Sequence, residues 1–434
     1  MCTSQPEVKP KKAETAPIEL AAIFQSLGPG YLEQGNLTFR QMSAFRNIVE
    51  CRTAAKGGHR WKCTSCDHEV NQYNSCLDRH CPKCQGKARW KWVANQETSM
   101  INAPYFHLVF TLPHQLNPLI AFNPRPLLDL LFKAVSQTLL AFGRDPKHLG
   151  GELGFITVLH TWNQKLERHY HLHCIVPGGA LSVNGDQWIH PKYDSYLFPE
   201  FALSETFRRL YWHGNKKCKG EDSNFDPSIP VFSGLKELLA EDSLHIPPSE
   251  ERFSKAEFIQ KLENSLYKQR WVVYAKRAFG GPTQVIRYLG CYTHRVAISN
   301  QRIVSHTNGM VTFSYKERKK EYRRRTLCLP ESKFADRFLQ HILPRGFWKV
   351  RSFGFLANRK KKKKIEQIHQ LLGQPVLTQA EDEKLKDSLL DEAETESTSP
   401  ELVCPHCQKP TLRYSRPVSQ WAQHLIRRAM WDTS

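Results

Sequence analysis

Three histidines alternate with other residues in the segment Glu167-Arg-His-Tyr-His-Leu-His-Cys-Ile-Val-Pro-Gly-Gly179. Successive side chains of a β-strand point to opposite faces of the sheet, so His169, His171 and His173 would share one face. Imidazole is a common protein metal ligand near neutral pH, and the pattern therefore predicts a metal site on a sheet. A group of hydrogen-bonded histidines without a metal is the alternative, and this segment alone does not separate the two.

A second strand is expected just upstream, from Gly154 to His160, and the polar residues 163–168 are typical of a hairpin loop. A symmetric hairpin places His160 directly opposite His171, with Cβ atoms about 4.5–5.5 Å apart. We therefore predict that His160, His171 and His173 bind one ion. His160 is preferred as the third ligand over Gln284 or His169, although a slip of one residue in the register would remove it.

Two tyrosines lie four residues apart in the sequence Tyr288-Leu-Gly-Cys-Tyr292. The preceding Gly281-Pro282 places proline at the first turn of a helix expected from Thr283 to about Arg295. Residues at i and i+4 share a helix face, so both phenols would project the same way. A tyrosine oxygen can act as a nucleophile, but paired tyrosines on a helix often only pack on a core, and both interpretations stay open at this point.

Cysteines provide a second set of metal ligands. Cys63-Thr-Ser-Cys66 and Cys81-Pro-Lys-Cys84 are separated by fourteen residues. This arrangement predicts one tetrahedral, structural zinc site of the ribbon type, formed by Cys63, Cys66, Cys81 and Cys84.

Other cysteines and histidines leave further zinc sites open. A second zinc ion could be held by Cys51, His59, Cys76 and His80, or these side chains could be buried thiols and hydrogen-bonded imidazoles. Cys404-Pro-His-Cys407 has no second cysteine pair downstream. We therefore expect no zinc at this lone knuckle unless chains or domains share the site.

The chain of 434 residues is long enough for two or three domains and is strongly basic, with a formal net charge of +20 and a pI near 9.4. Such a charge favours a polyanionic partner. Several basic residues lie near aromatic residues, and the expected DNA contacts are Arg79, Lys83, Lys87, Arg89, Arg295, Lys349 and Arg351.

The pattern of apolar residues predicts an α+β fold with an antiparallel sheet, because a strand at 105–112 and a helix at 126–142 precede the histidine hairpin. No signal peptide is expected, and no stretch approaches the ~18 apolar residues of a membrane span. We therefore expect a cytoplasmic protein without a membrane partner.

The wider sequence resembles the insertion-sequence-91 family of two-tyrosine rolling-circle transposases. The resemblance covers about Cys51 to Leu372. It depends on the strings RHCPKCQ, YFHLVFTLP, LHTW, HYHLHCIVPGG, WVVYAKRAFGGP, YLGCYTHRVAISN and LPRGFWKVRSFGFLANR.

The resemblance implies a His-hydrophobic-His (HUH) endonuclease, with an antiparallel sheet flanked by helices, a zinc-ribbon domain before it and a basic C-terminal region after it. It places the metal histidines at His171 and His173 and the nucleophiles at Tyr288 and Tyr292. Mg²⁺ or Mn²⁺ would be the catalytic cofactor and Zn²⁺ the structural one, although three imidazoles favour Mn²⁺ or later metals. The partner would be single-stranded DNA at transposon ends and target DNA, in the bacterial cytoplasm at the nucleoid.

The implied reaction is nicking and joining of single-stranded DNA through a 5′-phosphotyrosine intermediate. A plasmid-type replication initiator with the same site and a non-catalytic zinc-ribbon regulator are the alternatives. The expected organisation is a disordered start and helical entry at 1–50, a zinc-binding and DNA-binding domain at 51–100, the HUH catalytic domain at 101–300, a basic part at 301–375, and an acidic linker and tail at 376–434.

Overall fold

The computed structural model describes residues 17–34, 37–97, 99–193, 195–216, 230–277, 284–285, 290, 296–317, 323–376, 381, 383–384, 388 and 403–418. The side chains of residues 85–88 are outside this description. The predicted disordered start also lies outside the described residues.

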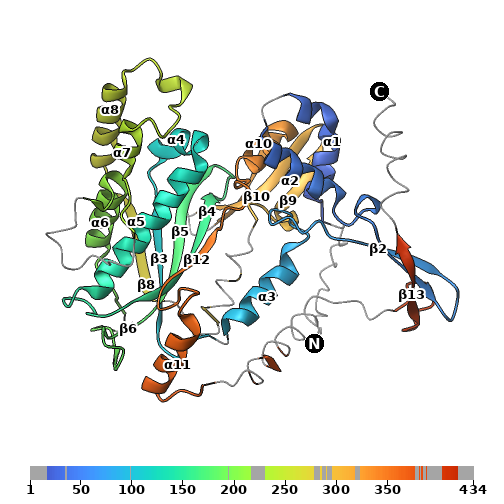
Figure 1. The fold of residues 1–434 in the computed structure, drawn as a ribbon. Coiled ribbons are helices and arrows are strands. Elements are labelled where there is room, and N and C mark those ends of the chain that lie inside the picture. Colours follow the sequence, from blue (N-terminus) through green and yellow to red (C-terminus); the bar gives the residue numbers. More distant parts are fainter. Residues whose placement is uncertain are drawn as a thin grey trace, which may run out of the picture.

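An antiparallel sheet of five strands, in the order β12-β4-β5-β3-β8, forms the centre of the molecule (Figure 1). Its strands are β3 (Tyr105–Thr111), β4 (Gly154–Trp162), β5 (Arg168–Pro177), β8 (Val272–Arg277) and β12 (Val350–Gly354). The hairpin β4–β5 lies inside the sheet, and both of its strands are largely buried. The predicted α+β fold with an antiparallel sheet is therefore confirmed.

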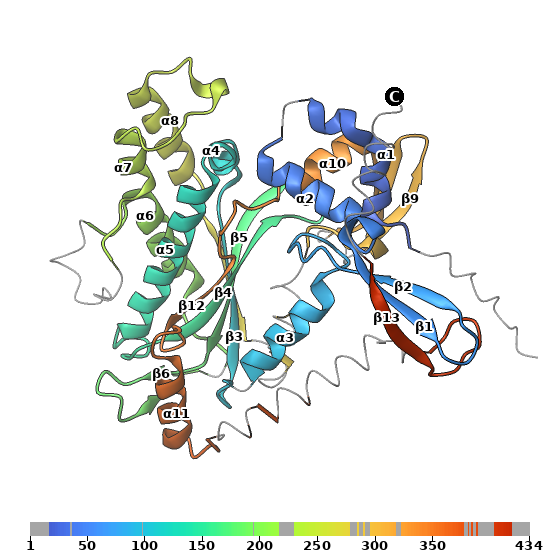
Figure 2. The same cartoon turned by 45° about the vertical axis from the view of Figure 1, so that its right-hand side comes forward.

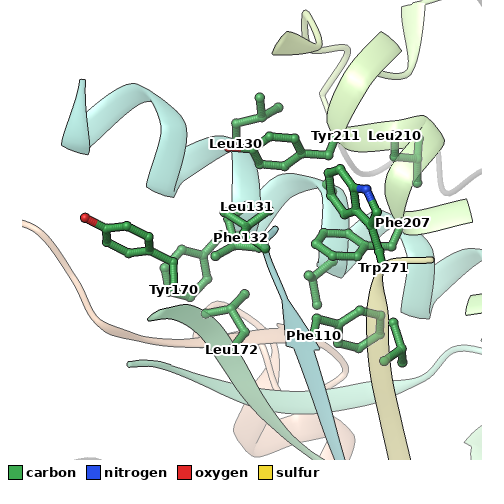
Figure 3. Packing of buried hydrophobic residues seen from close by; sticks show 14 of the residues in the cluster. Phe110, Leu130, Leu131, Phe132, Tyr170, Leu172, Phe207, Leu210, Tyr211 and Trp271 are labelled. Carbon is green, nitrogen blue, oxygen red and sulfur yellow. The ribbon is translucent and has the colours of Figure 1, made fainter. Parts of the chain in front are cut away.

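One face of the sheet is covered by α5 and α6 (Figure 1). The helices on this side are α4 (Asn117–Phe122), α5 (Pro124–Arg144), α6 (Glu200–His213), α7 (Leu235–Ala240) and α8 (Lys255–Tyr267). Figure 3 shows the core between this face of the sheet and the helices, where Leu172 and Phe110 of the sheet pack with Leu131, Phe207 and Trp271. A capping box formed by Ser254 and Glu257 begins α8.

The opposite face carries the histidines and packs against α3 (Gln85–Glu97). Val93 of this helix belongs to the same buried cluster as Ile156, Val158 and Ile175 of the hairpin. Helix α11 (Lys361–Leu371) contributes Ile365 and further apolar residues to that cluster. The short strands β6 (Ala180–Leu181) and β7 (Trp188–Ile189) pair beside it.

A second layered unit joins the beginning of the chain to residues far downstream. It contains α1 (Leu20–Glu33), α2 (Phe39–Glu50), β9 (Ile303–Thr307), β10 (Met310–Glu317), β11 (Arg323–Pro330) and α10 (Glu331–Leu339). Phe24 and Phe45 stack with ring centroids 4.4 Å apart, and Phe338 meets Phe24 edge-on. The buried cluster thus spans the predicted helical entry and the predicted C-terminal part.

A third, small sheet has the strand order β13-β1-β2 and projects from the rest of the molecule (Figure 2). Its strands are β1 (Gly58–Cys63), β2 (Glu69–Tyr73) and β13 (Leu412–Val418). Strand β13 therefore returns to the predicted zinc-binding region, and β12 completes the five-stranded sheet. Neither pairing was expected from the sequence, because each strand lies about 190 residues or more from its partner.

Helix α5 is the one described helix that is long and apolar enough to cross a membrane, contrary to the expectation that no stretch approaches that limit. Its most apolar window is 72 % buried inside the protein. Leu127, Leu131 and Leu139 are among its fully buried residues. The apolar composition of α5 is therefore explained by its place in the core.

Two glycines with left-handed backbone provide a matched test of the sheet. Gly354 has φ +60°, and a Cβ there would lie 1.6 Å from the carbonyl oxygen of Leu153. Gly309 has φ +69°, with nothing within 4 Å of its Cβ position, in the two-residue turn Asn308-Gly309 between β9 and β10.

We expect Gly354→Ala to lower the free energy of unfolding by more than about 3 kcal/mol, because the β12–β4 pairing must separate to admit a methyl group. Gly309→Ala should cost only about 1–2 kcal/mol, the conformational penalty alone. Urea denaturation followed by tryptophan fluorescence measures both, and equal losses would contradict the predicted close approach.

Candidate active site and metal centres

The register of the β4–β5 hairpin brings the predicted histidines together. His160 lies opposite His171, and Val158 lies opposite His173. A register irregularity between His160 and Trp162 displaces only the loop end of the hairpin. The predicted register is confirmed at the site.

His160, His171 and His173 form one buried group, with relative exposures of 4 %, 8 % and 7 %. One ring nitrogen from each lies within 4.8 Å of the others, a separation that allows all three to reach one ion. The rings of His160 and His173 have centroids 4.6 Å apart and meet edge-on. His169 shares the face but is outside the group, and its ring stacks on His114. Gln284 is exposed, and its role as a ligand stays a prediction.

Hydrogen bonds at the outer ring nitrogens suit metal binding. Nδ1 of His171 lies 2.8 Å from the carbonyl oxygen of His169, which can only accept, so the proton is on Nδ1. The proton on Nδ1 leaves Nε2 as the ring nitrogen that could bind a metal. This arrangement, in which a ligand histidine donates its other N–H to a carbonyl, is the usual support of a metal-binding imidazole.

His107 of β3 supports His173 in the same way and was not predicted from the sequence. Its Nε2 lies 2.8 Å from Nδ1 of His173, and the rings stack with centroids 5.1 Å apart. Burial lowers the pKa of His107 to about 4, so its ring is neutral at pH 7 and can accept the Nδ1–H of His173. The signal was a single imidazole at an alternate position of the apolar strand Tyr105–Thr111.

Tyr288 and Tyr292, the predicted nucleophiles, lie outside the described residues, as does Arg295. Between residues 278 and 295 the structure describes Gln284, Val285, which is buried, and Gly290. Val285 belongs to the cluster on the histidine face of the sheet, and a Cβ at Gly290 would meet Val93 of α3 at 2.4 Å. Val285 and Gly290 thus lie on the side of the sheet that carries the histidines.

The cysteines form two groups of four, and the predicted single site of Cys63, Cys66, Cys81 and Cys84 is wrong in its pairing. One group joins Cys81 and Cys84 to Cys51 and Cys76, with sulfur separations of 3.3 Å from Cys51 to Cys84 and 3.5 Å from Cys76 to Cys84. All four of its ligands come from the end of α2 and the segment 76–84.

The other group joins Cys63 and Cys66 to Cys404 and Cys407. The second cysteine pair for Cys404 and Cys407 therefore lies upstream, in another part of the chain. This is the shared site that was named as the exception to the expectation of no zinc here. The hydroxyl of Thr411 lies 3.0 Å from the sulfur of Cys63 and lowers the pKa of this thiol to about 6, so a thiolate forms readily.

His59 and His80, predicted as ligands of a second zinc ion, belong to neither group. Nδ1 of His80 faces a carboxylate oxygen of Asp78 at 3.1 Å, and Nε2 accepts from the backbone N–H of Leu343 at 3.4 Å. Both nitrogens are occupied, which excludes His80 as a ligand. His59 is exposed, and its ring meets Tyr414 edge-on.

Three of the predicted DNA contacts, Arg79, Lys349 and Arg351, are only partly exposed. Arg79 donates to the backbone oxygens of Phe347 and Pro344, the latter at 3.1 Å. Burial, with a smaller effect of Arg79, lowers the pKa of Lys349 to about 7. Arg351 forms an ion pair with Asp129. Arg79 thus joins the cysteine-rich region to residues just before β12, whereas Arg351 joins β12 to α5. Contact of all three side chains with DNA stays a prediction.

The remaining predicted contacts are more peripheral. Lys83 pairs with Glu19 at 2.5 Å, and the guanidinium of Arg89 lies 5.1 Å from the ring centroid of Trp90. The side chain of Lys87 lies outside the description.

Comparison with known proteins identifies two family models along the chain. Residues 154–224 and 229–364 match a family described as "Putative transposase", and residues 23–112 match a "Transposase zinc-binding domain". The first segment includes all three clustered histidines and the second includes the whole Cys51 group. No solved structure matches the chain.

Two curated proteins are similar over most of their length. The chain is 40 % identical to "Putative transposase y4qJ" of Sinorhizobium fredii over 371 residues, which cover 85 % of this chain and 88 % of the relative. It is 29 % identical to "Transposase for insertion sequence element IS801" of Pseudomonas savastanoi pv. phaseolicola over 332 residues, covering 76 % and 73 % of the two chains. These matches and the strings quoted above agree, and the chain belongs to the insertion-sequence-91 family of transposases, DNA-processing enzymes with a zinc-binding domain.

Proposed function

We propose that this transposase nicks and joins single-stranded DNA at the ends of its element by rolling-circle chemistry. The observation that carries the proposal is the buried group of His160, His171 and His173, with the outer nitrogen of His171 bonded to a carbonyl. DNA as the partner follows from the family, whereas the single-stranded substrate and the tyrosine chemistry are proposed. The protein would act in the bacterial cytoplasm at the nucleoid.

The histidine group fits a divalent cation, since three imidazoles converge and Nδ1 of His171 and of His173 lies within hydrogen-bond distance of a neighbouring group. Three nitrogen ligands favour Mn²⁺ over Mg²⁺ by ligand type. When bound, such a cation would polarise the scissile phosphate and help a tyrosine ionise near neutral pH. The role of the chain is to hold the three imidazoles on two adjacent strands.

The proposed nucleophiles are Tyr288 and Tyr292. A phenol oxygen forms a bond to phosphorus while the bond from phosphorus to the 3′ oxygen breaks, and the phenol proton passes through solvent to that oxygen. One phosphodiester replaces another, so no nucleotide cofactor is required. Two tyrosines allow two successive transfers without release of a broken strand. Val285 and Gly290 support this role, because both pack on the histidine side of the sheet.

We expect His171→Ala combined with His173→Ala to abolish cleavage of a single-stranded oligonucleotide by at least about 10³-fold, because the cation site loses two of its three ligands. Mn²⁺ binding measured by calorimetry should be lost in the same protein, while DNA affinity should change little. The matched control is His169→Ala, which removes an imidazole from the same strand and face but outside the group. Cleavage that persists in the double variant with Mn²⁺ or Mg²⁺ would refute the proposed site.

The tyrosines are tested by Tyr288→Phe and Tyr292→Phe, since phenylalanine keeps the ring and removes only the hydroxyl. The double variant should form no covalent DNA adduct on a denaturing gel while retaining Mn²⁺ binding. If the two phenols are interchangeable, each single variant still cleaves but fails in complete transposition.

Tyr267→Phe on α8 is the control and should leave the adduct unchanged, because this phenol is engaged with His213 away from the sheet. Mass spectrometry of the wild-type adduct identifies the nucleophile. An adduct on a residue other than Tyr288 or Tyr292 would rule out the proposed chemistry.

A further inference from the structure

Cys63, Cys66, Cys404 and Cys407 have the geometry of a tetrahedral thiolate site. The sulfur separations are 3.6 Å from Cys63 to Cys407 and 3.6 Å from Cys66 to Cys404. Four sulfurs at about 2.3 Å from one zinc ion lie about 3.8 Å from each other, whereas a disulfide would require about 2.05 Å. All four cysteines are free thiols, so the separations fit a shared zinc ion.

The two cysteine turns have the same backbone structure although they lie about 340 residues apart. Cys63 N–H donates to the oxygen of His68 at 2.9 Å, and Cys404 N–H donates to the oxygen of Lys409 at 2.8 Å, five residues onward in both turns. The cysteine carbonyls accept from the N–H groups of Asp67 and Gln408, four residues onward in each case. Asp67 and Gln408 also share a left-handed backbone, with φ of 56° and 57°. Equivalent turns that face each other are typical of a two-knuckle zinc ribbon.

Apolar burial alone gives the small sheet little stability. Among the described residues, its cluster has only Cys63, Cys404 and Leu412 as fully buried members. A structural metal usually supplies the missing free energy when a core is this small. The attachment of β13 to β1 therefore depends on these cysteines.

The attached strand also completes a basic face. Arg416 lies opposite Arg60, and Arg413 lies opposite Lys62. Arg413 and Arg416 are three residues apart and would point to opposite faces of a regular strand, but the bulge between them puts both on the face of Arg60 and Lys62. Like charges directly opposite each other destabilise a sheet unless an anion lies between or above them.

Only part of this positive charge is compensated within the hairpin. Glu69 pairs with Arg60 at 3.1 Å, and Asp67 pairs with Lys62 at 2.8 Å. Arg413 and Arg416 are both exposed. Basic side chains from two adjacent strands, β1 and β13, therefore share one face of the sheet. Such an arrangement fits the phosphates of a nucleic-acid backbone.

We infer that Cys63, Cys66, Cys404 and Cys407 bind a second zinc ion, which fastens the C-terminal strand β13 to the N-terminal hairpin and thereby completes a basic sheet face for DNA phosphates. The matched zinc-binding domain ends at residue 112 and contains only half of these ligands. The metal site is independent of the proposed cleavage chemistry, whereas the role of the basic face rests on the proposed binding of single-stranded DNA.

Zinc content of the purified full-length protein, measured by mass spectrometry of the metal, tests the site. The wild type should hold two zinc ions per chain, and Cys404→Ser with Cys407→Ser should hold one, as should Cys63→Ser with Cys66→Ser. The matched control Cys328→Ser removes an exposed thiol on β11 and should retain two. Two ions in either double variant, or one in the wild type, would overturn the inference.

Limited trypsin digestion tests the fastening of the strand. Cleavage after Arg413 should accelerate at least about tenfold in Cys404→Ser with Cys407→Ser, because β13 loses its anchor. Cleavage within the Cys51 group should be unchanged, which distinguishes local release from general unfolding. Equal cleavage rates after Arg413 in wild type and variant would show that zinc does not hold the strand.

The basic face is tested by Arg413→Gln with Arg416→Gln, which should keep both zinc ions. The affinity for a single-stranded oligonucleotide should fall, and the slope of log K against log salt should decrease by about 1.4, the value for two lost phosphate contacts. Lys236→Gln with Lys255→Gln removes the same charge from α7 and the start of α8 and should not change the slope. An unchanged slope in the arginine variant would refute the binding of DNA phosphates by the basic face, whereas the zinc site would be unaffected by this result.

Discussion

The pairing of β4 with β5 is the constraint on which the rest of the site depends. Because His160 lies opposite His171, three imidazoles from two strands reach one point, and a slip of one residue would turn one set of ligands into the apolar core. The same register sends Leu172 and its neighbours toward α5 and α6, so burial of that face fixes the position of the histidines. The neighbouring strand β3 adds His107 behind His173. Metal-ligand geometry and core packing are thus specified by one set of backbone hydrogen bonds.

The sequence predicts this hairpin well because its signals are local. Alternation of side chains, a polar loop and the spacing from His160 to His171 all lie within a stretch of about twenty residues. The distribution of the cysteines is different, since Cys63 finds its partners more than 300 residues away and Cys81 finds them in Cys51 and Cys76. Spacing along the chain contains no information on such distant contacts. Cys81 and Cys84, the nearest cysteine pair, were therefore predicted as the partners of Cys63 and Cys66, and this prediction was wrong. For the same reason β12 and β13 could not be assigned to their sheets.

The basic residues show a second limit of composition. Arg79 and Arg351 stand among aromatic residues, as DNA contacts often do, yet the first binds backbone oxygens and the second pairs with Asp129. A guanidinium has five N–H donors and suits the junction between two parts of a protein as well as it suits a phosphate. Net charge predicts a polyanionic partner. Only the contacts of each basic side chain within the protein indicate whether that side chain can also bind the partner. Arg413 and Arg416 of β13, which lie opposite Lys62 and Arg60, were not singled out, because the bulge that aligns them is invisible in the sequence.

Strand β12 has a consequence for how the enzyme is made. It forms an edge of the five-stranded sheet and covers β4, although its residues 350–354 are synthesised long after the histidine hairpin. Until these residues leave the ribosome, β4 presents unpaired N–H and C=O groups along its outer edge, and such an edge invites pairing with other chains. A complete sheet, and with it a fixed group of histidines, therefore forms only late in translation. Fragments that end before Val350 would carry every metal ligand of the histidine site and still expose an edge prone to aggregation.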